Sequence, residues 1–216
     1  FKNLLTKSME DTLLKASSVC VLFIGIGGAM QHMLKITDGT LETSGSMMLI
    51  ICFVLGSIIG ELLDIEGAFE RFGAWLRKKT HNESDTSFLS AFIHASLTVC
   101  IGAMAIVGSI QDGLLGDSSL LCAKAALDAV IILVMTASMG KGCIFSAIPV
   151  ALLQGGVTLL SRVLAPVFTE AAIANLSYTG SVMIFCVGLN LVWGKKIKVA
   201  NLLPTLVFAV LYALVF

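Results

Sequence analysis

Apolar residues along this chain come in long runs with few polar interruptions. A helix needs about 20 mostly apolar residues to cross the hydrocarbon core of a bilayer. Seven segments approach this length: 16–34, 47–63, 87–110, 120–140, 143–164, 178–193 and 202–216. The last two are short, and we expect them to be tilted or partly interfacial. The pattern predicts an all-α, polytopic transmembrane helix bundle of about seven spans, with residues 1–216 forming a single transmembrane domain.

The connection between the second and third segments has a one-sided pattern instead. Ile65, Phe69, Phe72 and Leu76 recur at helical spacing among acidic and basic residues. We expect an amphipathic helix over 64–79, lying in the cytoplasmic interface of the membrane. A plain solvated connector is the alternative interpretation.

Composition supports lipid as the solvent of this chain. Hydrophobic residues make up 57% of it and charged residues only 13%, and its mean hydropathy is +0.96. A soluble domain is about 25% charged. The net charge is zero and the basic residues are scattered, so nucleic acid is not an expected partner. The expected partner is the lipid bilayer.

Few residues suit a metal site or an enzyme. The six cysteines all lie in apolar stretches without C-x-x-C spacing, which indicates small buried hydrophobes rather than disulfides or a zinc site. Only three histidines are present, and none of the common hydrolase or metalloprotease motifs occurs. We therefore expect no metal, no cofactor and no enzymatic activity.

Basic residues fall in every second connection. They are Lys2, Lys7 and Lys15 before the first segment, Arg71, Arg77, Lys78 and Lys79 after the second, Lys141 after the fourth, and Lys195, Lys196 and Lys198 after the sixth. The other connections are acidic or neutral. Because positive residues stay on the cytoplasmic side, the basic connections are predicted to be cytoplasmic and the C-terminus to lie outside.

Two ionisable residues stand inside the fourth segment. Lys124 and Asp128 are four residues apart, on one face of a helix. An ionisable group in a span costs about 2.5–3.5 kcal/mol on insertion scales and usually faces the bundle interior. The pair is a candidate charge relay or substrate anchor. A structural ion pair that fixes helix packing is the alternative.

Polar residues of other segments complete the candidate substrate- or ion-binding set: His94, Gln111, Asp112, Gln154 and Asn190. The glycines between 102 and 116 permit an unwound or re-entrant segment, against the alternative of an ordinary helix end and turn. Gln154 is followed by two glycines and is expected to interrupt the fifth span after Pro149. Each of these polar residues can equally hold helices together by hydrogen bonds.

A weak internal similarity relates the two ends of the chain. Residues 1–30 aligned on 164–193 share five identities, including Ser18 with Ser181 and Gly25 with Gly188. Spans two to four and spans five to seven also run in opposite directions. Such an inverted repeat is common in secondary transporters, whose substrate site lies near the midplane.

Several motifs together resemble one family. They are Cys100-Ile-Gly-Ala-Met-Ala-Ile-Val-Gly-Ser-Ile-Gln-Asp-Gly-Leu-Leu-Gly-Asp117, Leu55-Gly-Ser-Ile-Ile-Gly-Glu-Leu-Leu63, Phe145-Ser-Ala-Ile-Pro-Val150, Gly188-Leu-Asn190 and Lys195-Lys-Ile-Lys-Val-Ala-Asn-Leu-Leu-Pro204. The chain resembles the domain-of-unknown-function 554 family of prokaryotic inner-membrane proteins, the YqgA/YdfK type. The resemblance implies a multi-span fold in the inner membrane but no activity, so it assigns no site residues. It also implies a further apolar span upstream of Phe1, which would make eight crossings.

These observations predict a secondary transporter or exporter of a small solute or ion. Its polar midplane site would be formed by Lys124, Asp128, Gln154, Asn190 and the 102–116 region, with Asp128 carrying the coupling proton or ion. A non-transporting membrane scaffold or helper subunit is the alternative function. Assembly into a homo-oligomer stays open.

Overall fold

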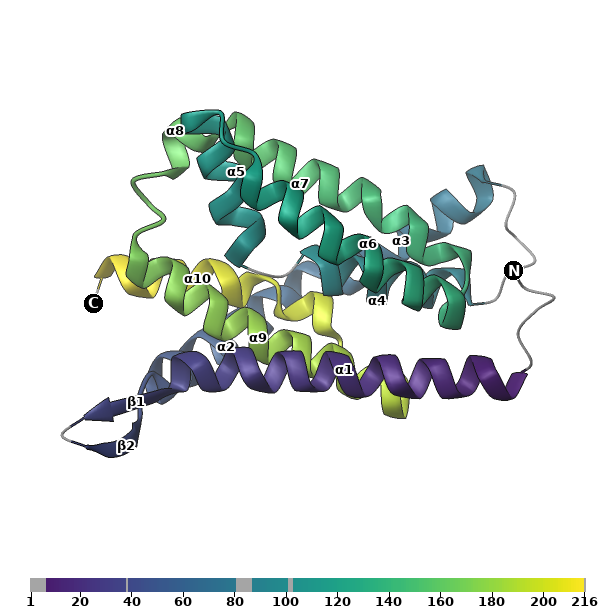
Figure 1. Ribbon diagram of the computed structural model, residues 1–216, viewed down its shortest axis with the longest axis horizontal. Coiled ribbons are helices and arrows are strands. Elements are labelled where there is room, and N and C mark those ends of the chain that lie inside the picture. Colours follow the sequence, from purple (N-terminus) through teal and green to yellow (C-terminus); the bar gives the residue numbers. More distant parts are fainter. Residues whose placement is uncertain (1–6, 38, 81–86, 101–102, 216) are drawn as a thin grey trace.

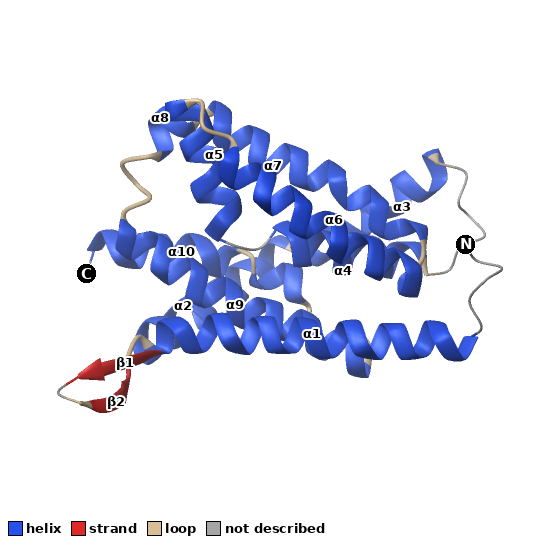
Figure 2. Ribbon diagram, viewed as in Figure 1, coloured by secondary structure: helices blue, strands red, loops and turns tan. Residues whose placement is uncertain are grey.

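The computed structural model describes residues 7–37, 39–80, 87–100 and 103–215, and within them the chain is helical apart from one short hairpin and connecting turns (Figures 1 and 2). The long helices are α1 (Lys7–Met33), α2 (Ser46–Leu63), α3 (Ile65–Lys79), α4 (Phe88–Cys100), α5 (Ala103–Leu115), α6 (Ser119–Met139), α7 (Ala147–Leu159), α9 (Glu170–Trp193) and α10 (Pro204–Val215). The short elements are η1 (Lys141–Ser146), α8 (Ser161–Leu164), η2 (Val199–Leu202) and the antiparallel strands β1 (Leu34–Thr37) and β2 (Thr40–Thr43). The all-α prediction is thereby confirmed.

The helices form two groups that pack on each other (Figure 1). One group contains α1, α2, α9 and α10, in which α9 packs against α1 and α10, and α2 against α10. The other contains α4 to α8 with η1. Contacts of α6 with α1, and of α4 and α5 with α9, join the groups. Helix α3 lies on α4 and η2.

Several helices are long and apolar enough to cross a membrane. Within the described residues they are α2, α6, the continuous stretch Lys141–Leu159, and α9. The pair α4 and α5 makes a fifth candidate, bent by 58°. Shorter apolar helices at Ser18–Met33 and Val199–Val215 coincide with the first and seventh predicted spans. Multiple apolar helices are confirmed, whereas the count of seven crossings stays a prediction.

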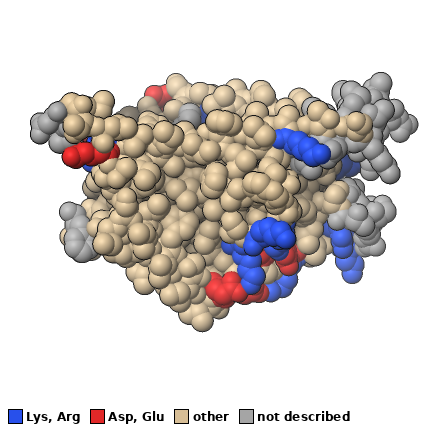
Figure 3. Space-filling model, turned by 90° about the horizontal axis from the view of Figure 1, so that it is seen from below, with Lys and Arg blue, Asp and Glu red and all other residues tan. Residues whose placement is uncertain are grey.

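The exterior carries the apolar side chains that a lipid environment requires. Phe23, Leu62, Leu133, Leu152 and Leu159 are each more than two-thirds exposed. Figure 3 shows a face that is largely free of charged side chains, with the charges gathered in separate patches. This surface suits hydrocarbon, because water does not tolerate so large an apolar area.

Two details differ from the sequence-based expectations. The third predicted span, 87–110, is divided into α4 and α5, and residues 101–102 at the division lie outside the described residues. The interruption expected at Gln154 is wrong: α7 continues through it, with Pro149 in the first turn, where the missing N–H costs no helical hydrogen bond.

The cysteines differ from one another in their exposure. All six are free; Cys52 and Cys143 are buried as expected, but Cys20 and Cys122 are exposed. Cys20 lies on α1 and Cys122 on α6, both on apolar helices. A small apolar side chain is as compatible with a lipid-facing surface as with a core.

Glycines set how closely helices approach. A Cβ at Gly60 of α2 would lie 1.7 Å from the Asn201 carbonyl oxygen, and one at Gly56 would lie 2.5 Å from the Thr205 backbone nitrogen. On α1, a Cβ at Gly25 would lie 2.5 Å from the Phe185 nitrogen of α9. Small residues permit this backbone contact in membranes, and at Gly60 it holds η2 directly against α2.

Replacing Gly60 by alanine should therefore separate η2 from α2. We expect G60A to lose about 1–3 kcal/mol of stability, the usual cost of overpacking. The matched control is G155A on α7, where a Cβ meets nothing within 4 Å, so that stability should rise by at most about 1 kcal/mol. Thermal unfolding in detergent measures both. Equal unfolding temperatures for the two variants would contradict this packing.

Candidate functional site

Asp64 sets the direction in which α3 leaves α2. It lies between the two helices in the left-handed region, at φ 47° and ψ 52°. Its carboxylate accepts hydrogen bonds from the Gly67 N–H at 3.2 Å and from Arg71 Nη1 at 3.1 Å. The Arg71 guanidinium lowers the pKa of Asp64, aided by the Gly67 N–H. This capped turn points the first turn of α3, and with it Glu66, towards the bundle.

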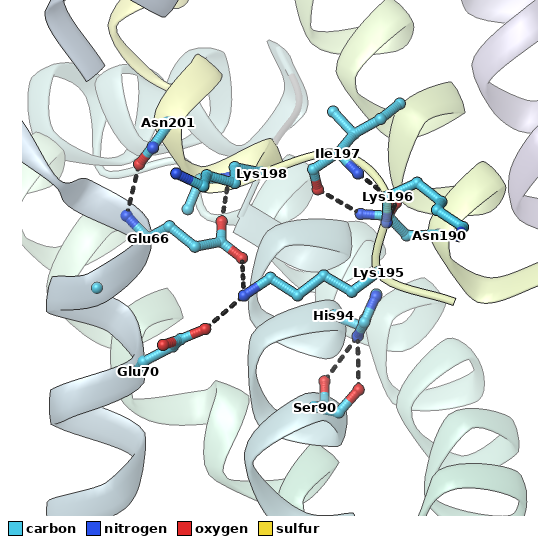
Figure 4. A network of polar contacts seen from close by, with 12 residues as sticks. Glu66, Glu70, Ser90, His94, Asn190, Lys195, Lys196, Ile197, Lys198 and Asn201 are labelled. Carbon is cyan, nitrogen blue, oxygen red and sulfur yellow. Dashed lines mark hydrogen bonds and ion pairs between the residues drawn. The ribbon is translucent and has the colours of Figure 1, made fainter. Parts of the chain in front are cut away.

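Glu66 connects three parts of the chain. Its side chain is only 7% exposed, and its Oε1 lies 3.0 Å from Lys195 Nζ. Its Oε2 accepts a hydrogen bond from the Ala200 N–H at 3.0 Å, and its own N–H donates to Asn201 Oδ1 at 2.7 Å (Figure 4). A buried carboxylate needs such pairing, because burying an unpaired charge is costly.

Asn190 shapes the connection that carries Lys195. From the last turns of α9, its Oδ1 accepts hydrogen bonds from the N–H groups of Lys196, at 3.0 Å, and Ile197, at 2.9 Å. Its Nδ2 donates to the Ile197 carbonyl at 2.7 Å. These three bonds close the chain back onto the helix end and place Lys195 over the carboxylates of α3 (Figure 4).

Lys195 lies between two acidic residues. Its ammonium group forms ion pairs with Glu66 and Glu70, which are four residues apart on one face of α3. Burial alone would lower the pKa of Lys195, but the hydrogen bonds from its ammonium to Glu70 and Glu66 outweigh that effect and raise it. The ammonium therefore stays charged at neutral pH.

These residues surround a cavity of about 210 Å³ between α3, α4 and α9. Its polar lining consists of Glu66, Glu70, Ser90, His94, Asn190 and Lys195, and its apolar lining of Leu89, Ile93, Leu97, Val187 and Val199. The Lys195 side chain is 47% exposed, so solvent reaches the polar side of the cavity. The arrangement can hold a small solute that has both a polar and an apolar part.

His94 is fixed within this lining. Its Nδ1 lies 2.8 Å from the Ser90 carbonyl oxygen and 3.2 Å from the Ser90 hydroxyl. A carbonyl only accepts hydrogen bonds, so we assign the proton of the neutral ring to Nδ1. The residue is 8% exposed, and among the described residues Nε2 has no hydrogen-bond partner, which leaves its lone pair for a ligand.

The structure brings His94 and Asn190 together but places the other predicted site residues elsewhere. Gln111, on α5, donates at 2.8 Å to Asp117 in the turn between α5 and α6. Asp112 is half-buried one residue further along α5, and Gln154 is half-buried on α7. None of these three lines the cavity.

Lys124 and Asp128 form the predicted ion pair, at a second location. Lys124 is 6% exposed, and its Nζ also donates to the Val99 carbonyl at 2.9 Å. Val99 is in the last turn of α4, where carbonyl groups lack helical partners. The lysine thus satisfies a carbonyl group at the end of α4, where its positive charge is also favourable.

Sequence reasoning missed the acidic and basic residues of the cavity. Glu66 and Glu70 fall within the amphipathic helix predicted over 64–79, and Lys195 falls in a connection predicted to be cytoplasmic. One signal was available: the two glutamates are four residues apart and lie on one face of α3, beside its apolar face. Their pairing with Lys195, however, joins distant parts of the chain and has no local signature.

Removing Lys124 should destabilise the bundle. K124M leaves the Asp128 carboxylate unpaired and the Val99 carbonyl without its donor, which should cost about 3 kcal/mol. The double variant K124M/D128L removes both charges and should recover most of that loss. Thermal unfolding in detergent distinguishes these cases. A double variant as unstable as K124M would show that an unpaired Asp128 carboxylate is not the cause of the loss.

Comparisons with known proteins identify a family and two relatives of this chain. The family described as "protein of unknown function (DUF554)" matches residues 1–214. The "uncharacterized membrane protein YdfK" of Bacillus subtilis is 24% identical over 206 residues, covering 95% of this chain and 84% of the relative. The "uncharacterized protein YqgA" of Escherichia coli is 25% identical over 165 residues, covering 74% and 70%. No solved structure matches.

The match extends over nearly the whole chain, from before the start of α1 into the last turn of α10. The apolar helices and the name of the relative from Bacillus subtilis both support a location in a membrane. The chain is a membrane protein that belongs to the DUF554 family.

Proposed function

We propose that this protein is a secondary transporter or exporter of a small solute or ion in a prokaryotic inner membrane, and that the cavity between α3, α4 and α9 is its binding site. One observation carries the proposal: Glu66, Glu70, His94 and Lys195 line a single cavity in a bundle of apolar helices. Of these, His94 lies on the apolar helix α4, and an ionisable group inside a span is costly and usually marks a solute pathway.

The arrangement of the connections supports a cytoplasmic opening. Figure 1 shows the start of α1, the end of α3 and the connection between α6 and α7 towards one end of the long axis. The hairpin, α8 and the C-terminus lie at the other end. The first end carries most of the basic residues, whereas Lys35 and Arg162 lie on the hairpin and α8, so the positive-inside rule favours the cytoplasm for the first end. Seven crossings satisfy this alternation.

The broken helix supports movement. The bend of 58° between α4 and α5 resembles the discontinuous helices that form transporter sites. Asp128 holds Lys124, Lys124 holds the end of α4, and α4 carries His94. In our proposal, protonation of Asp128 releases Lys124 and so shifts α4, which couples a proton to the cavity.

The contacts of α1 with α9 support an inverted repeat. Gly25 meets Phe185, and Gly188 meets Leu22. The alignment that matches Gly25 with Gly188 also matches Leu22 with Phe185. The contact of Gly25 with Phe185 therefore corresponds to the contact of Gly188 with Leu22. A two-fold relation between these helices is the geometry that an inverted repeat requires.

Transport is tested in proteoliposomes that contain a pH-sensitive dye. Gradients of single solutes are applied in turn: primary amines, carboxylates, sugars, Na⁺ and K⁺. The wild-type protein should move protons with at least one of them. D128N should abolish this movement while remaining folded, and E42Q, on the exposed hairpin, should behave as wild type.

Two results would contradict the proposal. Normal proton movement by D128N would eliminate Asp128 as the coupling residue. Folded wild-type protein that moves protons with none of the solutes would favour the alternative, a scaffold or helper subunit whose polar residues only hold helices together.

A further inference from the structure

The cavity already holds one aliphatic amine, the side chain of Lys195. Its ammonium group lies between the Glu66 and Glu70 carboxylates, and the residue is part of the lining together with Leu89 and Val199. Figure 4 shows the extended side chain reaching these carboxylates from the connection after α9. The lysine is tethered but half exposed, so a free molecule of the same chemistry can compete for its place.

The polar groups that surround this position are mainly acceptors. Glu66 and Glu70 are carboxylates, and the Nε2 of a neutral His94 presents a lone pair. An ammonium group has three N–H donors and no acceptor, which complements such a set. Charge-assisted hydrogen bonds of this kind are about twice as strong as neutral ones.

The remaining lining selects among cations. Leu89, Ile93, Leu97, Val187 and Val199 form an apolar wall, which favours an alkyl chain over a hydrated inorganic ion. Among the described residues, no three His, Cys, Asp or Glu side chains are grouped as metal ligands. An anion would meet the two carboxylates at close range and be repelled.

We propose that this cavity binds a small protonated aliphatic amine, and that Lys195 is a tethered competitor that occupies the carboxylates when the amine is absent. This inference rests on the proposed function, since it names the solute class of the same site. A primary amine with an alkyl chain of lysine-like length places its ammonium at Glu66 and Glu70 and its chain along the apolar wall. Binding then frees the connection after α9.

Removing the competitor should strengthen amine binding. A tethered group that fills the site about nine-tenths of the time reduces apparent affinity about tenfold. In detergent at neutral pH, we expect K195M to bind n-butylammonium about tenfold more tightly than wild type, measured by concentration-dependent thermal stabilisation. The matched control is K198M, from the same connection; its lysine pairs with Glu61 outside the cavity lining, and it should bind as wild type does.

Further probe molecules test whether binding needs both the positive charge and the alkyl chain of the amine. Butyrate has the alkyl chain with the opposite charge, and n-butanol has the chain without charge; neither should stabilise K195M. The double variant K195M/E70Q should lose most of the n-butylammonium effect. If it fails to fold, E70Q alone supplies the test, because it should bind n-butylammonium more weakly than wild type.

The outcomes are distinct from those of the transport assay. Equal stabilisation of wild type, K195M and K198M by n-butylammonium, or none of K195M, would overturn the amine site even where proteoliposomes move another solute. Selective stabilisation of K195M without proton movement in proteoliposomes would support the amine site and count against transport.

Discussion

The burial of the Glu66 carboxylate constrains much of this architecture. A charge removed from water must be paired and hydrogen-bonded, or it costs several kcal/mol. Glu66 meets this requirement with Lys195 and the Ala200 N–H, so one side chain on α3 fixes both the connection after α9 and the start of η2. The same constraint explains Asn190, whose three hydrogen bonds hold the chain that delivers Lys195. The cavity results from this arrangement. Helix α3, the connection after α9 and η2 meet through polar contacts and leave space beside the apolar wall.

Close backbone packing makes those polar contacts possible. Gly60 lets η2 approach α2, which brings Asn201 within reach of both the Glu66 N–H, at 2.7 Å, and Glu61 Oε2, at 2.6 Å. Glu61, which closes α2, pairs in turn with Lys198. Sequence features that look independent, a glycine in a span and an asparagine after a basic connection, therefore act together. Buried networks of this type are stable only when every member is satisfied.

Local patterns predicted the helices well because hydrophobic length is a local property. The apolar runs that contain α2, α6 and α9 and the one-sided pattern of α3 follow from neighbouring residues alone. The pair Lys124 and Asp128 could be predicted for the same reason, since four residues bring side chains together on any helix. The expected interruption at Gln154 was wrong because two glycines weaken a helix by only about 1 kcal/mol each, which packing of α7 can offset.

Long-range pairing could not be predicted in this way. Glu66 and Lys195 meet only because α3 lies on α4 and η2 and because α9 ends beside them. Basic residues such as Lys195 indicated a connection between helices, yet this pattern gave no partner for the charge. Likewise, His94 and Asn190 were recognised as polar residues in spans, but their shared cavity depends on the contact of α4 with α9.

The direct test of this account is the chemical reactivity of Lys195 in membranes that contain the full chain. An acylating reagent modifies only uncharged amines, and mass spectrometry can compare Lys195 with the exposed neighbour Lys196. The account predicts that Lys195 reacts several-fold more slowly, because Glu70 and Glu66 raise its pKa and hold its ammonium, and that the double variant E66Q/E70Q removes the difference. Equal rates for Lys195 and Lys196 in the wild-type protein would contradict the buried carboxylate pairing on which the cavity depends.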